Sequence, residues 1–162
     1  YPCRPERRFI PDPDEIEALI TKRTRAIVVI NPNNPTGAVY PRPVLEAIAR
    51  IAEKYHLLVL ADEIYDQMTY DDAEFTPMAT LVHQTLCGTL SGLSKVYRAC
   101  GYRVGWAVFS GDVEHSRVLL DLRLACCPPV TRTGRVRLVI LELLQQVGCS
   151  YLARPRGTRR AF

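Results

Sequence analysis

Residues 26–37 read AIVVINPNNPTG, and this stretch decides the fold. Its first half, Ala26–Ile30, is a continuous apolar and mostly β-branched run, which is typical of a parallel strand buried on both faces. Its second half, Asn31–Gly37, contains two prolines, three asparagines and a glycine, which indicates a dense turn. The stretch therefore predicts a buried strand that leads directly into a turn at one edge of a sheet.

Two further apolar runs end in polar residues in the same way. Residues 56–61, HLLVLA, lead into Asp62, and residues 86–90, LCGTL, lead into the loop that contains Lys95. The carboxyl ends of parallel strands lie at one edge of a sheet, and ligands of open α/β sheets bind at that edge. We therefore expect Asn34, Asp62 and Lys95 to lie near one another.

Helices are expected between and before these strands. Asp12 followed by Pro13 is typical of a helix start, and residues 41–55 carry apolar side chains at the spacing of an amphipathic helix. A fourth strand is expected over residues 104–110. This order of elements predicts an α/β fold, with a mainly parallel sheet and flanking helices.

Lys95 is one of three lysines, with Lys22 and Lys54. Its position after a buried strand, among small residues, predicts a poorly solvated amine, and such an amine is a good nucleophile towards a carbonyl carbon. The alternative is a lysine that only ends a strand in water, which is the commoner situation for an isolated lysine.

Composition and motifs exclude several functions. No glycine-rich dinucleotide fingerprint or nucleotide phosphate loop is present. The six cysteines and three histidines have no metal-ligand spacing, so we expect no metal site, reduced thiols and a cytoplasmic protein. We expect no secretion signal and no membrane partner, because the longest apolar-rich run, residues 136–144, contains charges and is too short to span a bilayer.

Three motifs together carry a family resemblance. NPNNPTG at 31–37, ADEIY at 61–65 and SK at 94–95 with Arg103 occur in an order that resembles the class I/II pyridoxal-phosphate (PLP) aminotransferases of fold type I. The surrounding residues are most similar to bacterial alanine aminotransferases. The resemblance covers about residues 1–111, and it implies the central part of the PLP-dependent transferase large domain.

The resemblance implies a role for each motif residue. Lys95 would form the Schiff base with the cofactor and move a proton during the reaction, and Asp62 would pair with the pyridine nitrogen. Asn34 and Tyr65 would bind the cofactor's phenolic oxygen. Ser94 and Arg103 would bind the phosphate, for which a guanidinium is well shaped.

The implied reaction is transfer of an amino group from L-alanine to 2-oxoglutarate, in a protein that is a homodimer when intact. The family's ring-stacking aromatic and its substrate-carboxylate arginine match nothing in these residues, so we predict negligible turnover by this chain alone. Other readings remain open: an aspartate or aromatic aminotransferase, a carbon–sulfur lyase of the same fold, a PLP-binding sensor domain of a transcription regulator, or a truncated product that binds no cofactor.

The end of the chain differs from the rest. Residues 1–114 carry 12 basic and 15 acidic residues, whereas residues 115–162 carry 9 basic and 2 acidic residues. We interpret 1–114 as the partial PLP-binding domain and 115–162 as a divergent basic tail, and our hypothesis is that this tail is translated out of frame. The competing interpretation is a helix over Arg137 to Val147 with a basic arm. Such an arm usually forms a solvated surface, so we expect no nucleic-acid partner.

Overall fold

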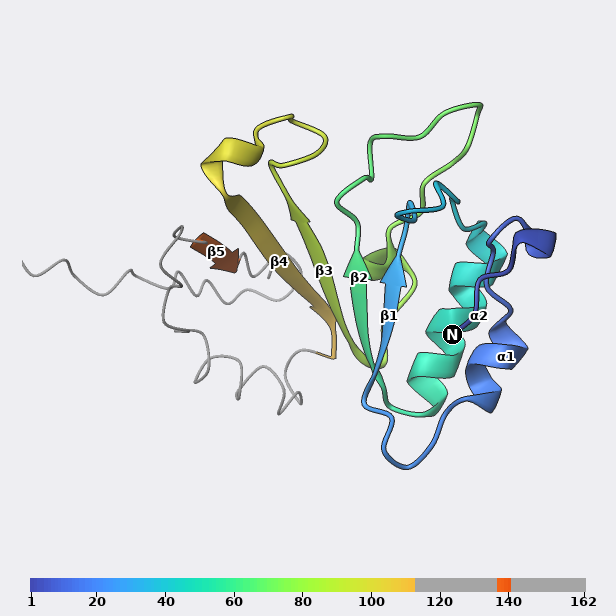
Figure 1. The fold of residues 1–162 in the computed structure, drawn as a ribbon. Helices are drawn as coiled ribbons and strands as arrows, with labels where there is room; N and C mark the ends of the chain where they lie inside the picture. The colour runs from blue at the N-terminus through green and yellow to red at the C-terminus, as the bar shows by residue number, and fades with distance from the viewer. Residues whose placement is uncertain (113–136, 141–162) are drawn as a thin grey trace, which may run out of the picture.

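The computed structural model describes residues 1–112 and 137–140 (Figure 1). The described residues form one five-stranded sheet with strand order β1-β2-β3-β4-β5, two α-helices and three short 3-10 helices. The strands are β1 (Ala26–Ile30), β2 (Leu58–Asp62), β3 (Leu86–Gly92), β4 (Val104–Gly111) and β5 (Arg137–Ile140). The helices are η1 (Pro5–Arg7), α1 (Pro13–Ala18), α2 (Arg42–Lys54), η2 (Met78–Thr80) and η3 (Cys100–Tyr102).

The two α-helices begin where the sequence predicts. Asp12 is the N-cap of α1, and its side chain accepts a hydrogen bond from the backbone N–H of Asp14 at 3.0 Å. Helix α2 buries its apolar stripe, including Leu45 and Ile48, which have no exposed surface. The stripe packs against the sheet, so tertiary contact rather than intrinsic propensity holds α2 in place.

Sheet topology confirms the predicted α/β fold with a mainly parallel sheet. Strands β1, β2 and β3 are parallel, whereas β4 runs antiparallel to β3, and β5 is parallel to β4. The expected helix from Arg137 is wrong over residues 137–140, which form β5. The β-branched residues Val139 and Ile140 favour a strand, and β4 offers an edge with which they pair.

Burial differs between the two faces of the sheet. Helices α1 and α2 lie on the same side (Figure 1), and their apolar residues form one core with the sheet side chains that face them. Those sheet residues are Ile27, Val29, Val59, Ala61 and Cys87. The prediction that Ala26–Ile30 is buried on both faces is wrong for the described residues, because Val28, on the other face, is 50% exposed.

The predicted division at residue 114 falls outside the described residues. Of the predicted basic tail, 115–162, the structure describes only β5. The interpretation of this tail as an out-of-frame segment therefore stays a prediction.

Candidate functional site

Three connections leave the sheet at the carboxyl ends of its parallel strands. They are the turn after β1, the segment after β2 and the β3–β4 loop, and all three lie at the upper edge of the sheet in Figure 1. Backbone hydrogen bonds continue the sheet into these connections: Asn31 N–H donates to Asp62 O at 3.1 Å, and Glu63 N–H donates to Leu90 O at 2.9 Å. The predicted site residues therefore share one edge of the sheet.

The turn after β1 is fixed by the side chain of Asn33. Its amide nitrogen donates to the carbonyl of Ile30 at 3.3 Å and to the hydroxyl of Tyr40 at 3.2 Å. Its amide oxygen accepts from the hydroxyl of Thr36 at 2.7 Å. Asn33 thus supplies the hydrogen bonds that hold the turn together. The side chain of the neighbouring Asn34 is exposed at the edge of the sheet.

Asn34, Tyr65 and Lys95 come together from three different connections. The amide nitrogen of Asn34 donates to the hydroxyl of Tyr65 at 3.4 Å, and the Lys95 Nζ lies 5.8 Å from the centre of the Tyr65 ring. An amide and a phenol at this separation can both donate to one oxygen atom of a ligand. The structure thus places two hydrogen-bond donors beside a primary amine.

The prediction that Lys95 is poorly solvated is wrong, because its side chain is exposed in the part of the chain that the structure describes. The strand that precedes it is buried, but the loop after β3 carries the lysine beyond the sheet. The amine is accessible to a ligand from solvent.

Asp62 is the last residue of β2. It pairs in register with Ile30 of β1 and Leu90 of β3, and its carboxylate accepts from the backbone N–H of Ile64 at 3.3 Å. Strand alternation places its side chain on the face opposite to that of buried Ala61. Asp62 is half-buried, so a carboxylate stands at the edge from which Asn34 also projects.

Ser94 and Arg103 occupy the β3–β4 loop, residues 93–103, together with Lys95. Arg103 is exposed, and its backbone has the left-handed conformation, with φ 51°. Its guanidinium donates a hydrogen bond to the carbonyl of Cys100 at 3.2 Å. Within the described residues, no hydrogen bond joins Ser94 or Arg103 to the other site residues. The β3–β4 loop therefore carries both residues without hydrogen-bonding their side chains to the rest of the candidate site.

One titratable residue at this edge was missed by sequence reasoning. Glu63 is only 5% exposed, and its carboxylate accepts from the backbone N–H of Met78 at 2.8 Å. Burial raises the pKa of this carboxyl group to about 7. A signal was available, because the alternation that buries Val59 and Ala61 continues to Glu63.

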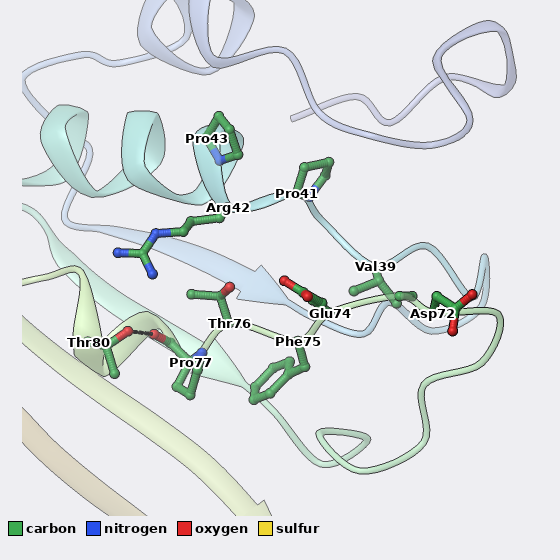
Figure 2. Close-up of a pocket in the computed structure, with 11 residues that line it drawn as sticks. Val39, Pro41, Arg42, Pro43, Asp72, Glu74, Phe75, Thr76, Pro77 and Thr80 are labelled. Carbon is green, nitrogen blue, oxygen red and sulfur yellow. Dashed lines mark hydrogen bonds between the residues drawn. The ribbon is translucent and has the colours of Figure 1, made fainter.

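Figure 2 shows a cavity, with a volume of about 810 Å³. The beginning of α2 lines one side of it, and residues 72–77 line the other. Figure 2 shows Arg42, Asp72 and Glu74 at the cavity, and Arg42 pairs with Glu46 at 2.7 Å. None of the predicted site residues lines this cavity.

Residues 1–112 and 137–140 contain neither a metal-binding cluster nor a membrane-spanning helix. No group of three or more histidine, cysteine, aspartate or glutamate side chains is arranged to hold a metal ion there. In the same residues, no helix has both the length and the apolar character needed to cross a bilayer.

Comparison with known proteins identifies relatives of the chain. A family model described as aminotransferase class I and II matches residues 1–128, and so continues past residue 111, where the resemblance read from the sequence ended. The glutamate-pyruvate aminotransferase AlaA of Escherichia coli is 50% identical over 121 residues, covering 75% of this chain and 30% of the relative. The alanine aminotransferase of Mycobacterium tuberculosis is 43% identical over 147 residues, covering 86% and 34%.

Solved structures agree with this result. The crystal structure of an aminotransferase from Escherichia coli matches with a TM-score of 0.69 and 46% identity, over 75% of this chain and 32% of that one. The chain spans about a third of the length of the relatives that it matches.

Proposed function

The chain belongs to the class I and II aminotransferases, and from this premise we propose that its sheet edge is the cofactor site of such an enzyme. The family depends on pyridoxal phosphate. The observation that carries the proposal is the meeting of Asn34, Tyr65 and Lys95, because three connections far apart in sequence bring an amide, a phenol and a primary amine to one place.

The side chains at this edge fit the chemistry of pyridoxal phosphate. An aldehyde needs an accessible primary amine, a phenolic oxygen needs hydrogen-bond donors, a pyridine nitrogen needs a carboxylate, and a phosphate needs a cation and a hydroxyl. The edge offers all of these groups on the connections described above. When bound, this cofactor supplies an aldehyde that accepts amino groups and a ring that withdraws electrons.

Each side chain would have a defined task. Lys95 would bind the aldehyde carbon through Nζ and later carry a proton on that atom. Asp62 would hold a proton at the ring nitrogen through its carboxylate. Asn34 and Tyr65 would donate hydrogen bonds to the phenolic oxygen and so orient the ring. Ser94 and Arg103 would bind the phosphate.

For the whole protein we propose transamination between L-alanine and 2-oxoglutarate by a cytoplasmic homodimer. The names of the relatives, alanine aminotransferase and glutamate-pyruvate aminotransferase, support the amino-group donor. The 162-residue chain itself should turn over negligibly, since we assign no residue in it to the substrate carboxylate.

The proposal is tested by reductive labelling. The purified chain is mixed with pyridoxal phosphate and treated with borohydride, and the adduct is located by peptide mass spectrometry. We expect a pyridoxyl group on Lys95, with little on Lys22 or on Lys54, whose amine is paired with Glu17 at 2.6 Å. Lys95→Arg is the control and should lose the adduct. Equal labelling of all three lysines, or no labelling, would contradict the proposal.

A further inference from the structure

Asp62 and Glu63 are consecutive residues with opposite surroundings. The side chain of Asp62 is half-buried at the candidate site, whereas Glu63 is buried on the side of the sheet that packs against the helices. There its carboxylate accepts from the N–H of Met78, which is itself only 1% exposed and belongs to the main core. Glu63 therefore connects the site's edge to the core.

The contact between Glu63 and Met78 closes a loop that contains Tyr65. The loop leaves β2 through two turns, in which Asp66 N–H donates to Glu63 O at 3.0 Å and Met68 N–H donates to Tyr65 O at 2.8 Å. It returns to the sheet at η2, where the Glu63 carboxylate receives the N–H of Met78. One residue thus holds both ends of the segment that positions the Tyr65 ring.

We propose that Glu63 is a positioning residue for the cofactor site. Its side-chain oxygen fixes the return of the 63–78 loop, and this keeps Tyr65 beside Asn34 and Lys95. The inference rests on the proposed function. It assigns the role to the acceptor oxygen and not to the negative charge, because among the described residues the side chain of Glu63 makes one hydrogen bond, from Met78 N–H.

A purely structural contribution must be separated from this role, and the chain offers a matched control. Glu53, in the last turn of α2, also closes a loop with its carboxylate, which accepts from the N–H groups of His83 and Gln84 at 2.7 and 2.9 Å. That contact precedes β3, at the end of the sheet opposite to the candidate site (Figure 1). Loss of either acceptor leaves buried or turn N–H groups without a partner.

The experiment compares E63L, E63Q and E53L with the wild-type 162-residue chain. Amide hydrogen exchange is followed at single residues, and the affinity for pyridoxal phosphate is measured from the Lys95 adduct at increasing cofactor concentration. We expect E63L to exchange about tenfold faster at Met68 and Met78 and to bind cofactor about tenfold more weakly. E63Q keeps an acceptor oxygen and should stay within about twofold of wild type in both.

The E53L variant should exchange faster at His83 and Gln84 alone, with cofactor affinity unchanged. The role of Glu63 would be overturned by wild-type exchange at Met68 in E63L, or by a loss of affinity in E53L equal to that in E63L. Loss of affinity in E63Q equal to that in E63L would also overturn it, because the charge would then be what matters. A wild-type chain without an adduct at Lys95 would overturn the proposed function, and this inference with it.

Discussion

The carboxyl group of Glu63 makes folding stability depend on pH. Burial, helped by the nearby charges of Asp66 and Asp62, raises its pKa from 4.5 to about 7. Between these two values the unfolded chain releases the proton while the folded chain keeps it, so the contribution of Glu63 to stability falls as pH rises. Above pH 7 both states are ionised and the penalty stays constant.

Glu63→Gln should therefore gain stability relative to wild type as pH rises. We expect the difference in the free energy of unfolding between variant and wild type to shift in the variant's favour by about 2 kcal/mol from pH 5 to pH 8. Urea unfolding at the two pH values measures this shift. A difference between the two proteins that is the same at both pH values would show that Glu63 does not titrate in this range.

Single residues of the site were predictable where a motif fixes them. The placement of Asn34, Asp62 and Lys95 at one edge follows from their positions at the ends of strands, because parallel strands bring their carboxyl ends together. Tyr65 was expected there only from the family resemblance. The solvation of Lys95 was not predictable, since it depends on the path of the β3–β4 loop. The contact of Glu63 with Met78 was hidden for a related reason: residues 69–77 have no periodicity that shows where the chain returns.

Among the described elements, helix α2 contributes the most buried residues to the main core. Ile48 lies in its middle with no exposed surface and belongs to the same core cluster as buried residues of β1 and β2. Ile48→Ala should lower the free energy of unfolding by about 2–5 kcal/mol, because it leaves a cavity in a close-packed interior. Arg50→Ala, two residues later on the exposed face, should change it by less than about 0.5 kcal/mol. Denaturant unfolding compares the two, and equal effects would contradict the assigned helix face.

At the scale of elements, the sequence predicted which strands and helices exist better than it predicted what each of them packs against. The bounds of β1 and α2 follow from β-branched runs and apolar periodicity, which are local properties. The antiparallel direction of β4 was not predicted, because residues 93–103 are long enough for either connection. The exposure of Val28 could not be read from its run of apolar neighbours, since it depends on which face the helices cover.

For the whole molecule, the topology separates the site residues held by the sheet from those carried by the β3–β4 loop, which contains Lys95 and the proposed phosphate ligands Ser94 and Arg103. Asn34 and Asp62 follow two parallel strands that pair directly, so the sheet itself sets their separation. Ser94 and Arg103 belong instead to a loop of eleven residues, whose conformation the sheet ladder does not fix. Bound phosphate would order this loop, so its effect should be seen in the stability of the whole chain.

Pyridoxal phosphate should therefore raise the melting temperature of the chain more than pyridoxal, which has no phosphate group. Arg103→Gln should remove most of this difference, because a guanidinium pairs with a phosphate and an amide does not carry the charge. The control is Arg98→Gln, since Arg98 is exposed, lies in the same loop and has the same left-handed backbone, with φ 50°. The Arg98→Gln variant should keep the difference in melting temperature between pyridoxal phosphate and pyridoxal. Thermal unfolding at matched ligand concentrations measures the shifts. If Arg98→Gln removed the difference as fully as Arg103→Gln, the loop would attract phosphate only through its net positive charge, and the assignment of Arg103 would be wrong.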